Sequence, residues 1–138
     1  MGYGSGDLGP VTFESLSKTQ KPNQVLICPP DLCTAKDVDQ ASPVYSLSAE
    51  VLKEKLLESL KQETNLERVD TSDTLQLRFI QRTPWMRFPD TLRIQLISQG
   101  ADLSTLALYG QSQIGETDFG VNRERATRWL KRLEQYQR

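Results

Sequence analysis

Histidine is absent from this chain of 138 residues. Its absence removes the most common general base, the Ser–His–Asp and Cys–His arrangements of nucleophilic catalysis, and histidine-based zinc sites. Acid–base chemistry is left to carboxylates, lysines and tyrosines, and no pair of carboxylates stands out in the sequence. We therefore predict no metal and no cofactor, and a non-enzymatic protein is favoured over an enzyme.

An excess of charge of one sign is also missing, since 17 basic side chains face 18 acidic ones and the net charge is −1. Non-specific binding of nucleic acid normally needs a basic face, so we expect no nucleic-acid partner. Basic residues do dominate two segments, from Arg78 to Arg93 and from Arg123 to the end. These segments either share a positive face or form ordinary solvated surface.

Long apolar runs are missing too. None approaches the roughly 20 residues of a membrane-spanning helix, and no apolar signal-peptide core is present, so we expect no transmembrane segment in this chain. The glycine-rich start predicts a flexible tail over residues 1–10, or the trimmed beginning of a longer precursor. Residues 11–138 are predicted to form a single domain.

Cysteine is scarce, and the two present, Cys28 and Cys33, bracket the sequence Pro-Pro-Asp-Leu. One C-x4-C pair lacks the second half of a structural zinc site and is not the C-x-x-C of a thioredoxin-type motif. The prolines and the aspartate favour a turn that brings the sulfurs together, so a disulfide is the preferred prediction. It implies an oxidising compartment such as a periplasm. Two free thiols in a cytoplasmic protein are the alternative.

Apolar periodicity, by contrast, is clear. Ser48 is the predicted N-cap of a helix whose leucines recur every four residues until about residue 62, and a last helix is predicted over about 119–136. Apolar alternation and short apolar runs predict strands at 24–28, 66–69, 75–79, 92–96 and 103–109. Short links between most of them favour antiparallel pairing. The predicted fold class is α+β, with two layers: an antiparallel β-sheet of about four to five strands covered on one face by two helices.

A distinctive phrase joins the last strand to the last helix. It has the spacing Ser-x-x-Gly-x-x-Asp-x-Gly-x-Asn-x-x-Arg, and its six defined positions are Ser112, Gly115, Asp118, Gly120, Asn122 and Arg125. With the segments 87–92 and 29–33, this 112–125 phrase resembles the family called domain of unknown function 1499 over most of residues 10–135. The resemblance implies a bacterial or plastid-lineage protein, often exported or membrane-tethered, with no established reaction.

The 112–125 phrase has two interpretations. In the first it locks a loop: Gly115 and Gly120 permit left-handed turns, Asp118 caps the last helix, and Asn122 ties the loop back by hydrogen bonds. In the second it binds an anion, because cations near the first turn of a helix are disfavoured by the helix dipole unless an acid or a ligand compensates them.

The second interpretation defines a candidate ligand-binding site. Its polar residues are Arg87, Asp90, Ser112, Asp118, Asn122, Arg123 and Arg125. Apolar contact comes from Trp85 and Phe88, in a loop bracketed by prolines that otherwise serves as a lid over the core.

Three functions follow from these patterns. The preferred one is a small exported or envelope-associated domain, periplasmic or membrane-associated, that binds a small or lipidic anionic ligand or an envelope protein without catalysis. The alternatives are a structural or assembly module without a ligand, and a carboxylate-dependent enzyme that uses Asp118 or Asp90 as its base.

Overall fold

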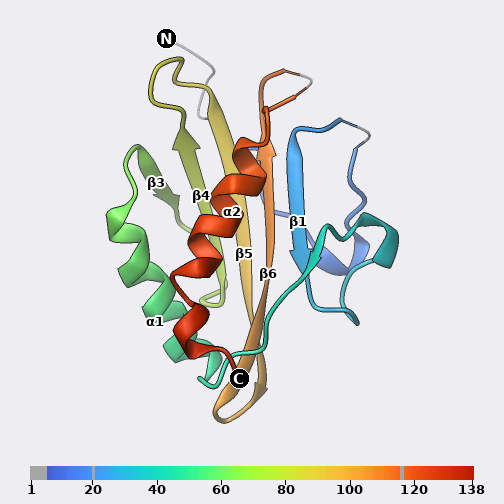
Figure 1. The fold of residues 1–138 in the computed structure, drawn as a ribbon, viewed down its shortest axis with the longest axis vertical. Coiled ribbons are helices and arrows are strands. Elements are labelled where there is room, and N and C mark those ends of the chain that lie inside the picture. The colour runs from blue at the N-terminus through green and yellow to red at the C-terminus, as the bar shows by residue number, and fades with distance from the viewer. Residues whose placement is uncertain (1–5, 20, 116) are drawn as a thin grey trace.

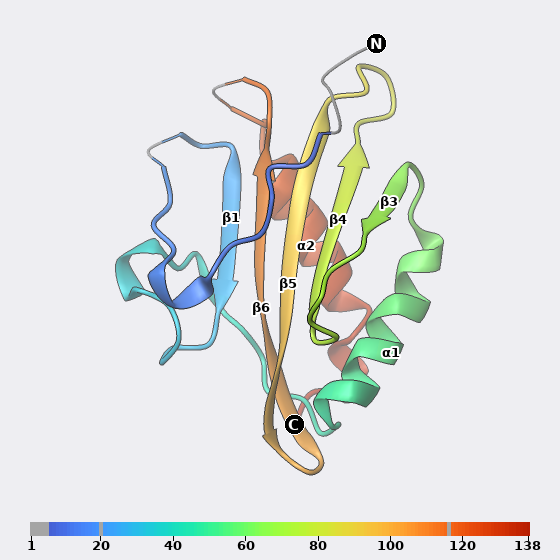
Figure 2. The same ribbon diagram turned by 180° about the vertical axis from the view of Figure 1, so that it is seen from behind.

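A computed structural model describes residues 6–19, 21–115 and 117–138. Within these residues, a six-stranded sheet carries two α-helices on one face, and the N-terminal segment crosses the other face (Figure 1, Figure 2). The strands and helices are β1 (Gln24–Cys28), β2 (Gln40–Ala41), β3 (Leu66–Val69), β4 (Gln76–Arg82), β5 (Pro89–Gly100), β6 (Leu103–Ser112), α1 (Ala49–Ser59) and α2 (Val121–Lys131). The strand order is β2-β1-β6-β5-β4-β3.

The predicted α+β class is confirmed, but the strand number and the purely antiparallel pairing are wrong. The described sheet has six strands, and Ile27 and Cys28 of β1 pair in parallel with Gln40 and Ala41 of β2. Both residues of β2 are exposed, so no apolar alternation marks this strand in the sequence. Its pairing depends on residues 29–39, which bring the chain back alongside β1.

The two helices cover one face of the sheet. The predicted N-cap of α1 is confirmed, because Ser48 Oγ accepts a hydrogen bond from Val51 N at 3.1 Å. Helix α2 buries Trp129 edge-on against Phe79 of β4, with ring centroids 6.0 Å apart. It is shorter than predicted and is followed by a 3₁₀ turn, Glu134–Tyr136. In the described part of the chain, no helix has the length and apolar character needed to cross a membrane.

The opposite face of the sheet is covered as well. Leu26, Cys28 and Tyr109 form a second buried cluster there with Phe13, which belongs to the segment that crosses this face in Figure 2. Of the predicted tail, residues 6–10 are described and contact the sheet, while residues 1–5 lie outside the described part. Thr91 Oγ1 donates to the carbonyl of Gly6 at 2.9 Å, and Arg93 Nε donates to that of Gly9 at 2.7 Å.

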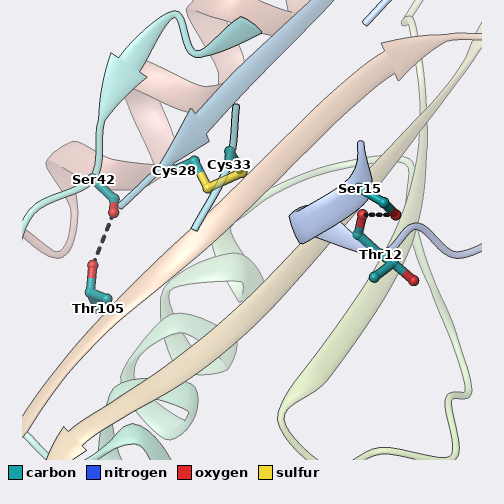
Figure 3. Close-up of a disulfide and its surroundings, with 6 residues drawn as sticks. All are labelled: Thr12, Ser15, Cys28, Cys33, Ser42 and Thr105. Carbon is teal, nitrogen blue, oxygen red and sulfur yellow. Dashed lines mark hydrogen bonds between the residues drawn. A yellow bond between two sulfur atoms is a disulfide. The ribbon is translucent and has the colours of Figure 1, made fainter. Parts of the chain in front are cut away.

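The predicted disulfide between Cys28 and Cys33 is present, and both residues are buried. Figure 3 shows Cys28 at the end of β1 joined to Cys33 of the following loop. A hydrogen bond of 2.9 Å between Ser42 Oγ and Thr105 Oγ1, drawn as a dashed line in the same figure, attaches the chain after β2 to β6. The disulfide therefore closes the loop that leads into the parallel pair.

Reduction of the disulfide is expected to lower the free energy of unfolding by about 2 kcal/mol, because it releases a short closed loop in the unfolded chain. Urea unfolding with and without dithiothreitol measures this difference. The variant Cys28→Ala/Cys33→Ala is the control and should not respond to the reductant. Equal unfolding midpoints for the oxidised and reduced wild type would contradict a stabilising role.

Candidate ligand-binding site

A buried ion pair joins the sheet to helix α2. Arg125 of α2 places Nη2 2.8 Å from Oδ2 of Asp90, the second residue of β5, and both side chains are almost fully buried. The other carboxylate oxygen of Asp90 accepts a hydrogen bond from Ser112 Oγ at 2.7 Å. A buried charge is costly unless it is paired and hydrogen-bonded. These contacts compensate the cost of burying both charges.

Asn122 and Asp118 attach the loop before α2 to this ion pair. Asn122 Oδ1 accepts from Arg125 Nη1 at 2.9 Å, and its Nδ2 donates to Asp118 Oδ2 at 2.9 Å and to Ser112 Oγ at 3.2 Å. The Asp118 carboxylate also accepts from the backbone N–H groups of Gly120 (2.8 Å) and Asn122 (3.0 Å). It thereby satisfies donors at the first turn of α2. The polar side chains of the 112–125 phrase are thus bonded to one another.

Three glycines make this arrangement possible. Gly115 and Gly120 have φ angles of 86° and 80°, which confirms the predicted left-handed turns. Gly110 of β6 is required for a different reason, which the sequence did not reveal. A Cβ atom there would lie 2.7 Å from Asn122 Oδ1 and 2.9 Å from Leu92 Cδ1. The absence of a side chain at Gly110 makes room for the buried amide.

The network continues from Arg125 toward the edge of the sheet. Arg125 Nε donates to Gln81 Oε1 at 2.5 Å, and Gln81 Nε2 donates to Glu63 Oε1 at 2.9 Å. Glu63 also forms ion pairs with Arg128 and Arg132, each at 2.7 Å. Burial by itself raises the pKa of Glu63, but the hydrogen bonds from Arg128, Gln81 and Arg132 outweigh burial and hold the pKa well below its ordinary value. Neither Gln81 nor Glu63 was among the predicted site residues, since no motif marks them.

A hollow of about 530 Å³ opens beside this network. We call it the arginine hollow, because four arginines and two glutamates line it: Arg82, Arg125, Arg128, Arg132, Glu63 and Glu124. Thr83 and Pro84 line one side and Val121 another. The β4–β5 loop and the beginning of α2 therefore border the same hollow.

Three large apolar side chains are exposed in the two loops beside the arginine hollow. Trp85 is 93% exposed and Met86 is 62% exposed in the β4–β5 loop, and Phe119 is 91% exposed just before α2. We call these three residues the apolar rim. Figure 1 and Figure 2 both show the two loops at the same end of the sheet.

The predicted site residues divide into two groups. Asp90, Ser112, Asp118, Asn122 and Arg125 come together in the buried network described above. The remaining four lie outside it: Arg87, whose Nη1 donates to Asn65 Oδ1 at 3.0 Å; Phe88, which is half-buried; Trp85, on the rim; and Arg123, 3.2 Å from Asp39.

Arg123 belongs to a separate polar groove of about 820 Å³. In this groove the Asp39 carboxylate binds Lys18 (2.9 Å) as well as Arg123 (3.2 Å). The Asp39 carboxylate also accepts a hydrogen bond from Leu26 N at 2.7 Å. The groove is lined by four cations and three acids, whereas the arginine hollow is lined by four cations and two acids, so the hollow is the better candidate for an anionic ligand.

Fold and site together define an α+β domain in which a buried polar network supports an arginine-lined hollow with an apolar rim. The chain matches the model of the family described as protein of unknown function DUF1499 over residues 15–133, and it belongs to that family. A search of the curated proteins finds no match to the chain.

Asn122→Ala is expected to lower the free energy of unfolding by about 1–3 kcal/mol, because it removes the buried amide that bonds Arg125, Asp118 and Ser112. Urea unfolding measures the change. Thr127→Ala, at an exposed position of the same helix, is the control and should stay within about 0.5 kcal/mol of wild type. An unchanged midpoint for Asn122→Ala would rule out the loop-locking role.

Glu63→Gln is expected to make stability less dependent on acid pH. A carboxyl with a depressed folded pKa contributes stability that is fully present above its unfolded pKa and is lost as the pH falls through the folded pKa. The stability difference between wild type and Glu63→Gln should therefore be constant at neutral pH and shrink below the ordinary pKa of 4.5.

Urea unfolding over a series of pH values tests the Glu63 prediction. Glu67→Gln, at an exposed position of β3, is the matched control and should follow the wild type throughout. A difference for Glu63→Gln that stays the same down to pH 2 would contradict the proposed contribution of the ionised carboxylate.

Proposed function

We propose that this domain is a non-enzymatic binding module of an oxidising compartment, periplasmic or membrane-associated, and that it binds an anionic, lipidic ligand at the arginine hollow. The observation that carries the proposal is the combination of a surplus of arginines in the hollow with exposed apolar side chains beside it. The disulfide supports the oxidising compartment, because such bonds persist mainly outside the cytosol.

The charges around the hollow favour an anion. Its lining contains four arginines against two glutamates, and Asp90 balances Arg125 from the buried side. Arg87 adds a further cation, since its guanidinium bonds the neutral side chain of Asn65 on the wall of the hollow. Guanidinium groups recognise phosphate and carboxylate oxygens through paired N–H donors. A phosphate or carboxylate headgroup therefore fits the chemistry of this hollow.

The apolar rim favours a ligand with an apolar part. Trp85 and Phe119 are each more than nine-tenths exposed. Their rings therefore bury little apolar surface in the unbound fold and contribute little to its stability. Apolar groups of a ligand bound in the arginine hollow would lie within reach of these loops. The buried network then serves as the rigid support that holds both loops in place.

A structural module without a ligand remains the second candidate, and one observation favours it. Asp90, Asp118 and Asn122 use their polar atoms within the chain, so the most distinctive residues of the 112–125 phrase stabilise the fold directly. The same bonds occupy both carboxylates that an enzyme would use as a base.

The test is a titration of the isotopically labelled protein with monomeric dihexanoylphosphatidylglycerol, followed by amide NMR. We expect shifts around residues 62–65, 81–85 and 121–125, and weaker or no shifts with dihexanoylphosphatidylcholine. Arg82→Gln/Arg87→Gln should weaken binding by about tenfold, since each arginine contributes a charge-assisted contact.

Arg68→Gln, an exposed arginine of β3, is the matched control and should bind as the wild type does. If the anionic amphiphile causes no shifts around the hollow, or if Arg68→Gln weakens binding as much as the double variant, the binding proposal fails in favour of the structural module.

A further inference from the structure

We propose that the domain docks on the surface of an anionic lipid bilayer by inserting the apolar rim, Trp85, Met86 and Phe119, so that the arginine hollow faces the lipid headgroups. This inference rests on the proposed function for the role of the hollow, but it adds a partner, the bilayer, and a docking surface. Four observations lead to it.

The first observation is that the β4–β5 loop holds Trp85 and Met86 outward in a closed turn. Thr83 N donates to the carbonyl of Phe88, and Arg87 N donates to that of Thr83, each at 3.0 Å. Phe88 N donates to Thr83 Oγ1, also at 3.0 Å. Because these bonds close the turn at its base, the two apolar side chains at its tip are presented by an ordered backbone.

The second observation is the backbone of Phe119. Its φ angle is 54°, in the left-handed region that a bulky side chain rarely adopts. Its N–H donates to Thr117 Oγ1 at 3.1 Å, and the turn continues into the Asp118–Gly120 contact. An exposed phenylalanine in this conformation stabilises neither the turn nor the core. Its position is explained if the ring has a partner outside the chain.

The third observation is that the side chains of the apolar rim protrude and do not line the neighbouring hollows. Among the described residues, those that line the arginine hollow and the polar groove do not include Trp85, Met86 or Phe119. Side chains that stand clear of these two hollows suit a partner that surrounds them, as the interfacial region of a bilayer does. Tryptophan is particularly well suited to that region, because its ring is apolar and its N–H is polar.

The fourth observation is the charge beside the rim. Arg87 directly follows Met86, and Arg82 Nη1 donates to the carbonyl of Arg87 at 3.3 Å. Two acids of the arginine hollow and the buried Asp90 form ion pairs, Asp90 with Arg125, Glu63 with Arg128 and Arg132, and Glu124 with Arg128. Asp118, directly before Phe119, accepts hydrogen bonds from backbone N–H groups of Gly120 and Asn122. Arginines beside Trp85 and Met86 are complementary to anionic lipid headgroups.

The experiment is flotation of the protein with vesicles of phosphatidylcholine alone or of phosphatidylcholine mixed with phosphatidylglycerol. We expect binding to the anionic vesicles and a blue shift of tryptophan emission, which reports Trp85 because Trp129 is already buried. Trp85→Ser/Phe119→Asn should weaken this binding by about tenfold or more, since it removes two of the three inserted side chains.

Two further variants separate docking from folding. Phe119→Asn alone should weaken vesicle binding while its melting temperature stays equal to or above that of wild type, because asparagine tolerates the left-handed backbone better than phenylalanine. Trp85→Phe keeps an apolar ring and should retain most of the binding. Arg68→Gln again controls for a general loss of positive charge.

Each outcome decides for or against docking. No binding to anionic vesicles, equal binding to phosphatidylcholine alone, or equal binding by Trp85→Ser/Phe119→Asn would overturn it. Self-association through the rim without vesicle binding, seen by sedimentation, would overturn it in favour of a second copy of the chain.

The same experiments separate docking from the proposed function. If monomeric dihexanoylphosphatidylglycerol binds at the hollow but vesicles do not, the proposed function stands and docking is wrong. If the rim variants abolish vesicle binding but the monomeric amphiphile does not bind, docking stands and ligand binding in the hollow is wrong.

Discussion

The buried ion pair between Arg125 and Asp90 is the interaction on which the rest of this structure depends. It places one charge of α2 and one of β5 in the interior, where neither is stable alone. Further side chains of the network satisfy the two charges. Ser112, Asn122 and Gln81 supply further hydrogen bonds of the pair, and Gly110 leaves the space that Asn122 occupies. Replacing one partner would leave the other charged and unsatisfied, so the residues of the 112–125 phrase form a unit.

This unit has a geometric consequence for the surface. Helix α2 starts where Asp118 and Asn122 hold its first turn, and β5 starts beside the β4–β5 loop. The ion pair thus fixes the distance between two loops that are far apart in the sequence. Both side chains of the pair are almost fully buried, although Arg125 also lines the arginine hollow. The parts left for binding are the arginines of the hollow and the apolar side chains at the loop tips, which agrees with the common division between a rigid scaffold and functional loops.

The sheet is covered on both faces, and this explains why β1 is marked in the sequence by an apolar run and not by alternation. Val25 and Ile27 of β1 pack toward the helices, while Leu26 and Cys28 pack toward the N-terminal segment. A strand buried on both faces is apolar throughout, so its sequence lacks the alternation of a half-exposed strand. The disulfide lies in the second of these two clusters and connects the covering loop to β1.

Much of this architecture could be predicted from local sequence. Ser48 and the leucine repeat indicated α1, because helix capping and periodicity act within a few residues. The Cys28–Cys33 spacing indicated the disulfide for the same reason, and the 112–125 phrase indicated the family. In each case the physical cause lies within a short stretch of chain.

Other features were decided only by the tertiary structure, because they depend on contacts between distant segments. The two exposed residues of β2 carry no strand signal and pair only because the preceding loop returns along β1. Gln81 and Glu63 join the polar network because β4 and the end of the α1 segment lie beside α2, and no local pattern distinguishes them from surface residues. The arginine hollow likewise needs side chains from three parts of the chain. The sequence by itself therefore determined the class, the N-cap of α1, the disulfide and the family, while the tertiary structure decided which charges are buried and which remain available to a partner.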